Sequence, residues 1–467
     1  MYIRSLHLAN LRCFKKADLN FQYPGRVTEA GDVPVSSLPN VNLLLGNNGA
    51  GKSTVLQGIA LALISPVVQH TGYRAQSMVR RSFGAQRGRS PERSTIQADV
   101  VVTAADVDLT PLERKMTSPP KNGKAGNYAL ELGIERLRDT EILKSLQAGD
   151  PPWSRMFEEK TPGFLVLGYG ANRWVAPRHV NVLSQFKENH IRYQRVRSLF
   201  EDGVSLFPLS QWLPDYSNKG RRKQVITILH DLLEPHGFAF EGESENGELI
   251  FQQGKARMPY PALSHGFRAF IGWIGDLLYH VCEWCPSGAK LRDIEGVVMV
   301  DEVDLYLHPE WQRTVIESLA KLFRNVQFIF SSHSPLVTGS LEWANIWVMD
   351  ANGPKQLADE PIHGLSADQV LLSPYFGLVT TRADRKMKDL HQLNARAIKG
   401  DRQAATEFLR QLSTGTESAK SLPREVVSPY VPANIESWDA VMAMPTPVIK
   451  RASLSANAKP TGKRKSK

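Results

Sequence analysis

The sequence predicts an α/β fold in which helices flank a mixed or parallel sheet, and three patterns support this prediction. Strands that are buried on both faces are expected at Val41–Leu45, Val297–Val300 and Phe328–Phe330, because apolar residues there are nearly continuous. Helical patterns follow the first two of these strands, over Ser53–Ile64 and Trp311–Phe323. Strands and helices that alternate in this way are typical of a largely parallel sheet.

The other elements are predicted from the N-terminus onward. The opening segment YIRSLHLANLRCF alternates as a strand does, and Ala17–Phe21 is its expected antiparallel partner. Residues 23–40 are rich in Pro, Gly and Ser and are expected to form a loop. The remaining predictions are strands at 96–103, 127–134 and 164–169, helical patterns over 182–235, an amphipathic helix over Ser264–Cys282, and two helices within 365–412.

The composition is that of a globular protein. Of the 467 residues, 42% are hydrophobic and 22% are charged, which argues against wholesale disorder or a fibrous repeat. The longest nearly apolar stretch, Ile59–Val68, is interrupted by Ser65 and Pro66, so no membrane span is expected. The N-terminus lacks the pattern of a signal peptide, and the expected location is cytoplasmic.

Cysteine usage agrees with a reducing compartment. The chain has 3 cysteines, and this small and odd number argues against a disulfide framework. Cys282 and Cys285 form one CxxC pair near His280, but no second pair completes a zinc site. Two interpretations of this pair therefore remain, ordinary packing in the core and a metal or redox role.

Positive charge is concentrated in two segments of a chain whose net charge is +10. Residues 450–467 contain seven Lys or Arg residues and no acidic residue, and we expect the end of the chain to be poorly ordered in isolation. The second segment contains Arg74, Arg80, Arg81, Arg87, Arg89 and Arg93, beside the single acid Glu92. Either segment could contact the phosphates of DNA or RNA or form a solvated surface.

The strongest functional pattern is a phosphate loop between the first buried strand and the helix that follows it. Glycines allow backbone N–H groups to turn toward a triphosphate, while the lysine reaches the terminal phosphates and the hydroxyl of Ser53 ligates Mg²⁺. ATP and Mg²⁺ are therefore the expected cofactors. The pattern GxxxxGK[ST] and the residue after it are Gly46, Asn47, Asn48, Gly49, Ala50, Gly51, Lys52, Ser53 and Thr54.

Three further patterns complete the candidate site. Asp301 and Glu302 follow a buried strand, where Asp301 would hold the metal and Glu302 would activate water. His333 follows the next strand and would hydrogen-bond the terminal phosphate. Ser264 and Gly266 stand where a helix begins and form a candidate anion site, although Ser is also a common N-cap.

These elements, with LSHGFR, VVMVDEVDLYLHPEWQ and FIFSSHSP downstream of GNNGAGKST, resemble the ABC-type ATPase heads of the SMC/RecF/OLD group. The resemblance extends to LHLANLRCF, VRRSFG and LGYGANR, which look like those of compact bacterial ATPases of the anti-phage defence type. It implies a P-loop NTPase head that dimerises around two ATP molecules. Lys52, Ser53, Asp301, Glu302 and His333 would then act in cis.

The same resemblance assigns the residues that act between subunits. Ser264 and Gly266 would contact the terminal phosphate in trans, Asp304 would lie in the interface, and Arg12 would lie near the phosphates. The signature departs from the family pattern, because LSHGF stands where transporter ATPases have LSGGQ. The candidates for the metal-contacting Gln are Asn172, Gln69 and Gln76, and the pair Arg80 and Arg81 matches a basic position of the group.

The predicted organisation has five regions. They are an N-terminal ATPase lobe at 1–103, an inserted and partly helical lobe at 104–255, a C-terminal ATPase lobe at 256–350, a helical extension at 351–425, and a basic tail at 426–467.

The expected function is a nucleotide-gated dimeric switch in nucleic-acid-related processes, above all anti-phage defence with a separate effector such as a nuclease. A DNA-repair ATPase of the RecF type and an ABC-transporter ATPase subunit are alternatives. A self-contained nuclease of the OLD type is weakly supported, because no DxD pair follows a strand after His333. The expected partners are a second copy of the chain and the effector, with DNA or RNA as a further candidate and no membrane.

Overall fold

A computed structural model gives the fold of the chain. It divides into two compact units, Met1–Thr381 and Arg382–Lys467, which are described separately. The residues that the structure describes are 1–27, 33–81, 92–107, 125–138, 140–146, 165–175, 190–244, 247–286, 288–350, 352–358, 360–381 and 384–413.

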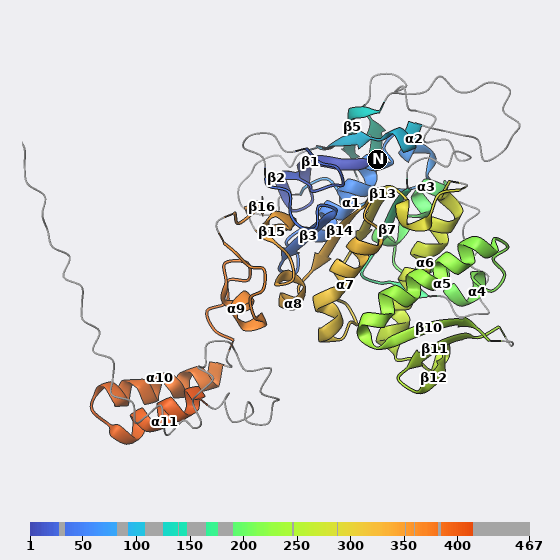
Figure 1. The fold of residues 1–467 in the computed structure, drawn as a ribbon. Helices are drawn as coiled ribbons and strands as arrows, with labels where there is room; N and C mark the ends of the chain where they lie inside the picture. Colours follow the sequence, from blue (N-terminus) through green and yellow to red (C-terminus); the bar gives the residue numbers. More distant parts are fainter. Residues whose placement is uncertain are drawn as a thin grey trace, which may run out of the picture. The chain divides into compact units, whose positions relative to one another are not determined.

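A six-stranded sheet forms the centre of the first unit (Figure 1). All neighbouring strands are parallel except the pair at one edge, β15 and β16, which is antiparallel. The expected α/β class, with a mixed sheet flanked by helices, is confirmed. In spatial order the strands are β16 (Gly353–Lys355), β15 (Ile346–Asp350), β3 (Val41–Gly46), β14 (Val326–Ser332), β13 (Gly296–Val300) and β7 (Leu165–Tyr169).

An antiparallel sheet of five strands forms a second layer. β1 pairs with β2 as the sequence predicts, and Leu8 faces Ala17 across this pair. β5 and β6 extend the sheet beyond the predicted boundary at residue 103, so part of the expected insertion continues this layer. The strands in order are β2 (Phe14–Asn20), β1 (Tyr2–Leu11), β4 (Arg93–Val102), β5 (Gly126–Leu137) and β6 (Thr140–Ser145).

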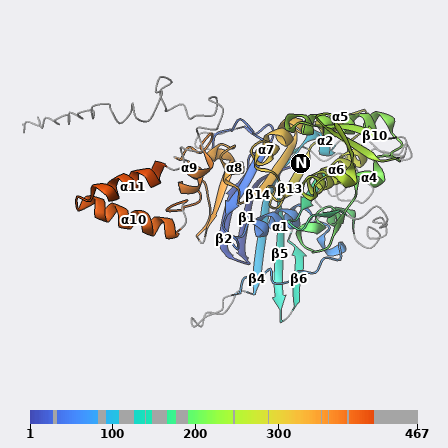
Figure 2. The ribbon, with the colours of Figure 1, turned by 90° about the horizontal axis from the view of Figure 1, so that it is seen from below.

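Helix α1 (Lys52–Leu63) lies between the two sheets and contacts strands of both. All its side chains except that of Ser53 are buried, which explains why its sequence is apolar on nearly every side. Figure 2 shows the layers from below, with β4 and β5 on the far side of α1 from β13 and β14.

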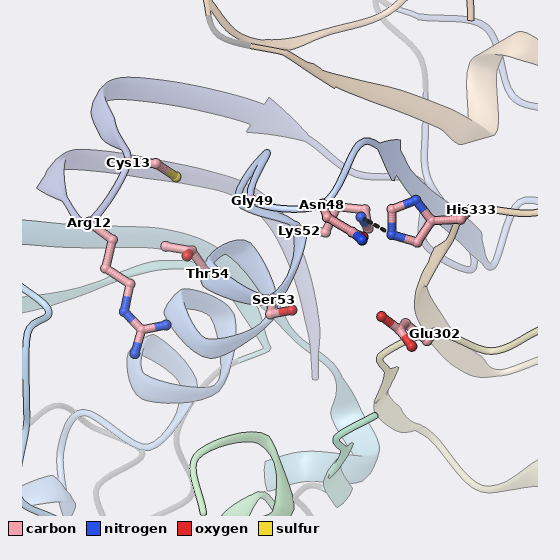
Figure 3. A pocket seen from close by; sticks show the side chains of 10 residues that line it. Arg12, Cys13, Asn48, Gly49, Lys52, Ser53, Thr54, Glu302 and His333 are labelled. Carbon is pink, nitrogen blue, oxygen red and sulfur yellow. Dashed lines mark hydrogen bonds between the residues drawn. The ribbon is translucent and has the colours of Figure 1, made fainter. Parts of the chain in front are cut away.

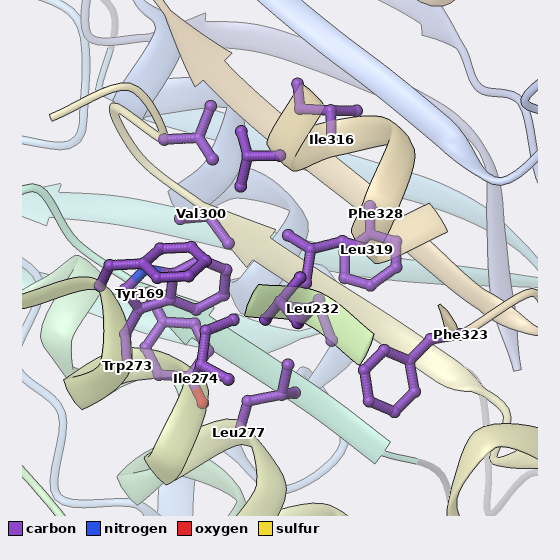
Figure 4. Packing of buried hydrophobic residues seen from close by; sticks show 14 of the residues in the cluster. Tyr169, Leu232, Trp273, Ile274, Leu277, Val300, Ile316, Leu319, Phe323 and Phe328 are labelled. Atoms are coloured by element: carbon purple, nitrogen blue, oxygen red, sulfur yellow. The ribbon is translucent and has the colours of Figure 1, made fainter. Parts of the chain in front are cut away.

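Alternate side chains of the central strands enter two hydrophobic cores. On β13, Val297 and Met299 pack toward α1, whereas Val298 and Val300 pack on the opposite face. Figure 4 shows that opposite core, where Trp273 and Ile274 of α6 (His265–Trp284) pack near Val300, and where Leu319 of α7 (Pro309–Leu322) also lies. Burial on both faces accounts for the continuous apolar runs in the sequence.

The described residues between β7 and α6 include helices, and they also include strands that the sequence analysis did not predict. A three-stranded antiparallel sheet follows α5 and consists of β10 (Phe238–Glu243), β11 (Leu249–Gln253) and β12 (Ala256–Pro259). β8 (Trp174–Val175) and β9 (Ser205–Leu206) form a short parallel pair. The other helices of this unit are α2 (Ala104–Val107), α3 (Ile191–Gln194), α4 (Leu209–Trp212), α5 (Lys219–Leu233), α8 (Pro335–Thr338) and α9 (Ala367–Leu372).

The second unit contains α10 (Asp384–Ile398) and α11 (Arg402–Ser413), which contact each other. The sequence predicts two helices within 365–412, whereas the structure has three there. The first of them, α9 (Ala367–Leu372), belongs to the first unit. Of the apolar residues of α10, Leu390 is buried and Ile398 is exposed. The basic tail, predicted at 426–467, lies outside the described residues. No helix among the described residues combines the length and the apolar character that a membrane crossing requires.

Candidate active site

The candidate site lies where parallel strands of the central sheet end. The phosphate loop follows β3, the acidic pair follows β13, and His333 follows β14. Because these strands run in the same direction, their carboxyl ends meet at one edge of the sheet, where α/β folds bind ligands. The resulting pocket has a volume of about 350 Å³ (Figure 3). Its lining residues are Arg12, Cys13, Asn48, Gly49, Gly51, Lys52, Ser53, Thr54, Glu302 and His333.

Two glycines of the phosphate loop adopt left-handed backbone conformations, with φ of 79° at Gly49 and 98° at Gly51. A Cβ atom at Gly51 would lie 2.4 Å from Cζ of Phe14, so the loop also needs glycine there for space. Gly51 is the N-cap of α1, and as a glycine it offers no side chain to cap that end. The first N–H groups of the helix therefore remain available to an anion.

Lys52 and His333 lie side by side in this pocket (Figure 3). The Lys52 ammonium donates to the carbonyl of Gly46 at 2.8 Å and to that of Asn47 at 3.3 Å, and its Nζ lies 2.7 Å from Nε2 of His333. Burial lowers the pKa of Lys52, against the opposing effect of the nearby carboxylates. Burial also lowers the pKa of His333, and the charge of Lys52 adds to this effect. A neutral His333 can accept the hydrogen bond from Lys52.

Ser53 and Asp301 form the candidate metal site. The Ser53 hydroxyl donates to Oδ2 of Asp301 at 2.6 Å, and Oδ1 of the same carboxylate accepts from the Ser331 hydroxyl. The carboxylate of Asp301 is buried, and β14 holds it in place through Ser331. A hydroxyl and a carboxylate that converge in this way are the oxygen donors that Mg²⁺ prefers.

Glu302 lines the pocket opposite the phosphate loop, and its φ of 49° is unusual for a residue that is not glycine. Its N–H donates to the Ser331 hydroxyl at 2.8 Å. A left-handed residue of this kind costs about 1–3 kcal/mol, so it persists only where its neighbours hold it. The Glu302 side chain points into the pocket (Figure 3).

Ser264, Gly266 and Asp304 do not line the pocket. Ser264 is exposed and caps α6 by accepting from the N–H of Phe267. A Cβ at Gly266 would lie 2.4 Å from the carbonyl oxygen of Tyr306, so the start of α6 packs against the loop that follows the acidic pair. One carboxylate oxygen of Asp304 is buried without a hydrogen-bond partner.

Of the other predicted residues, Arg12 lines the pocket, and the candidates for the metal-contacting Gln do not. Arg12 reaches the pocket, with φ of 46° and a hydrogen bond of 2.6 Å from its guanidinium to Gln57. None of the three candidates for the metal-contacting Gln lines the pocket: Asn172 donates to Asp202, and Gln69 and Gln76 are exposed.

A second cavity of about 160 Å³ lies behind the phosphate loop, where Asn47 and His333 meet residues 374–377. The CxxC cysteines belong to the hydrophobic core, and burial raises the pKa of Cys282 to about 12. No group of three or more metal-ligating side chains of His, Cys, Asp or Glu occurs in the described part of the chain.

Sequence reasoning missed two residues that support the site. Ser331 bonds both Asp301 and Glu302, and its only signal was the polar end of an otherwise apolar strand. The guanidinium of Arg173 donates to the carbonyls of Asp301 and Glu302 from the segment after β7. Its signal is the segment LGYGANR, for which the family resemblance assigns no role to the arginine.

Two family models and one solved structure match large parts of the chain. Residues 5–136 match a family described as "AAA domain", and residues 172–338 match one described as "AAA domain, putative AbiEii toxin, Type IV TA system". The SMC head domain from Thermotoga maritima aligns with 76% of this chain and 99% of its own, at 13% identity and a TM-score of 0.41.

Two similar proteins come from bacteria. "Retron Ec83 probable ATPase" of Escherichia coli is 34% identical over 124 residues, which are 27% of this chain and 23% of the relative. "Septu protein PtuA" of Bacillus mycoides (strain KBAB4) is 23% identical over 360 residues, 75% of this chain and 42% of the relative. The chain thus spans less than half the length of either. Residues 5–136 and 172–338 thus match AAA-domain families, and the chain is similar in sequence to these retron and Septu proteins.

Proposed function

We propose that this chain binds ATP with Mg²⁺ and hydrolyses it in the pocket between the phosphate loop and the acidic pair. One observation carries the proposal. Lys52, Ser53, Glu302 and His333 come from three different segments and line the same pocket, with Asp301 directly bonded to Ser53.

The residues of the pocket have separate roles in binding and hydrolysing ATP. Lys52 and the free N–H groups of α1 neutralise the phosphates, since both present positive charge at the same end of the helix. Ser53 and Asp301 would hold Mg²⁺, which supplies further charge neutralisation when it is bound. Glu302 orients and deprotonates the attacking water, and His333 exchanges its contact with Lys52 for one with the terminal phosphate.

The active form is a dimer in which each site is completed by the other subunit. Ser264 is exposed at the start of a helix and lies outside the pocket of its own chain, which agrees with a role in trans. Asp304 and the exposed Tyr306 follow the acidic pair and would lie in the same interface. Higher homo-oligomers are compatible with this arrangement.

In the cell the dimer acts as a nucleotide-gated switch in anti-phage defence, and a separate effector protein such as a nuclease carries out the response. DNA or RNA is a candidate ligand. The supports are the resemblance to compact defence-type ATPases of the SMC/RecF/OLD group and the similarity to proteins named for retron and Septu systems.

ATP binding by the purified chain and by Lys52→Ala tests this proposal. The wild type should bind ATP, and the variant should lose at least about tenfold in affinity, because a charge-assisted contact to phosphate contributes about 1.5–3 kcal/mol. Lys321→Ala is the matched control, because Lys321 is exposed, lies outside the pocket and pairs with Glu317 on its own helix. Equal affinity of all three proteins would contradict the proposal.

A further inference from the structure

The loop after β13 has an unusual backbone. Glu302 and Tyr306 both have left-handed conformations, with φ of 49° and 66°, although neither is glycine. Such conformations are strained, and they persist only where surrounding contacts hold the backbone. Several N–H groups of the loop are held by neighbouring strands: that of Asp301 donates to Tyr169 at 2.8 Å, and that of Val303 donates to Ser331 at 2.9 Å.

Two carbonyl groups of this loop are held by one side chain. The Nη1 and Nη2 groups of Arg173 donate to the carbonyl oxygens of Asp301 and Glu302, the second at 2.7 Å. Arg173 comes from the segment after β7, which pairs directly with β13. A guanidinium suits this task because its planar fork presents two N–H groups in fixed directions, which a lysine ammonium does not reproduce.

The surroundings of Arg173 favour a fixed position. Burial lowers its pKa to about 10, against the opposing effect of Asp301 and Glu302, so the group stays charged at neutral pH. Arg173 itself does not line the pocket, whereas Glu302 does. Its influence on a bound nucleotide therefore passes through the backbone that it holds.

We propose that Arg173 is a positioning residue, whose guanidinium fixes the peptide groups of Asp301 and Glu302 so that Glu302 points at the reacting phosphate. This inference rests on the proposed ATPase function. Loss of the contact lets the strained turn relax, which moves the Glu302 carboxylate while the phosphate loop stays intact. Hydrolysis should therefore suffer far more than nucleotide binding.

The test compares Arg173→Ala, Arg173→Lys and the wild type for ATP affinity, kcat and KM. A displaced base costs on the order of 10²-fold in rate, so kcat of Arg173→Ala should fall by about that factor while ATP affinity changes by less than about threefold. Arg173→Lys should not restore the rate. Guanidinium ions at millimolar concentration should restore part of it in Arg173→Ala but not in the wild type.

Arg221 provides a matched control. Its guanidinium also donates to backbone carbonyls, those of Cys282, Cys285 and Pro286, but at the end of α6 and outside the pocket. Arg221→Ala should lower thermal stability and leave the kcat of the folded protein unchanged. If Arg173→Ala behaves in the same way, or if it loses ATP affinity as strongly as rate, Arg173 is structural or binds the nucleotide, and the inference fails.

Hydrogen exchange separates this inference from the proposed function. The amides of Glu302 and Val303 should exchange faster in Arg173→Ala than in the wild type or in Arg221→Ala, without any need for turnover. A wild type without ATPase activity would refute the proposed function and with it the catalytic effect, whereas unchanged exchange in Arg173→Ala would refute the positioning contact by itself.

Discussion

The hydroxyl of Ser53 donates to Oδ2 of Asp301 at 2.6 Å, across 248 positions of the chain. The phosphate-loop helix and the acidic strand end therefore present their oxygen atoms to the same point. Each oxygen also has a fixed support, because Ser53 lies in the first turn of α1 and Asp301 is bonded to Ser331. A site for a hard cation requires this convergence of oxygen donors.

Substitution of Ser53 should reduce the effect of Mg²⁺. In the wild type we expect ATP to bind more tightly when Mg²⁺ is present, and Ser53→Ala should lose most of that gain while it keeps the metal-independent affinity. Ser53→Thr is the control, since it retains a hydroxyl. Titration of each protein with ATP, with Mg²⁺ and with a chelator, measures the difference. A gain from Mg²⁺ that is equal in all three proteins would exclude Ser53 as a ligand.

Gly51→Ala should impair both folding stability and nucleotide binding. The new Cβ would meet Phe14 at 2.4 Å at a backbone φ of 98°, and overpacking of this kind costs about 1–3 kcal/mol. Gly254→Ala separates the two causes, because Gly254 also has a positive φ, of 58°, but no atom within 4 Å of its Cβ position. Thermal unfolding should show the larger loss for Gly51→Ala, and only that variant should bind ATP weakly. Similar behaviour of the two variants would show that the contact with Phe14 is unimportant.

The dimer model predicts a separation of binding from turnover at Ser264. Ser264→Tyr should still bind ATP but hydrolyse it slowly, because the bulky residue blocks the partner's site. The lost N-cap would cost about 1 kcal/mol, and Ser366→Tyr controls for it, because Ser366 caps α9 and lies outside the pocket. Light scattering should find dimers of Glu302→Gln with saturating ATP. Monomers under that condition would refute the shared site.

Many strands could be predicted from the sequence, because strands buried on both faces and strands buried on one face have different hydrophobic patterns. The strands of the central sheet are apolar throughout and were found at β3, β13 and β14, while β1 and β2 alternate as antiparallel strands do. β10 to β12 were missed because short, partly exposed strands leave a weak pattern. β15 was also missed, because Ile346 to Met349 form a short buried run, and such a run does not distinguish a strand from a segment of a buried helix.

For the site, the sequence predicted the residues with a recognisable chemical task but not those that orient them. Lys52, Ser53, Glu302 and His333 stood in patterns that carry phosphate chemistry, and the structure brings them to one pocket. Arg173 and Ser331 act through backbone carbonyls and N–H groups, whose positions depend on the path of neighbouring strands. No local pattern of side chains reports such a contact. Arg12 turns toward Gln57, a partner that only the fold reveals.

Stability should fall on mild acidification, partly because of His280. Burial lowers the pKa of His280 from its ordinary 6.5 to about 3, so below pH 6.5 the unfolded chain takes up a proton that the folded protein does not. This contribution costs about 0.8 kcal/mol of stability between about pH 7.5 and pH 6.

Asp276, which faces His280 at 3.6 Å, has the opposite effect. Burial raises its pKa to about 6, so its protonation stabilises the folded protein at lower pH. His280→Gln should therefore lose less stability than the wild type over that pH range, as denaturant titrations at the two pH values would measure. A pH dependence identical to that of the wild type would show that His280 is not held neutral.

ATP hydrolysis by Glu302→Gln, measured beside the wild type, tests the central claim most directly. The amide keeps the size of the side chain but cannot accept a proton from water, so the variant should bind ATP with an affinity near that of the wild type and should release phosphate on the order of 10²–10⁴-fold more slowly. Intact ATP should be recovered from the protein after prolonged incubation. Phosphate release by Glu302→Gln at the wild-type rate would contradict the assignment of this pocket as a hydrolytic site with Glu302 as its base.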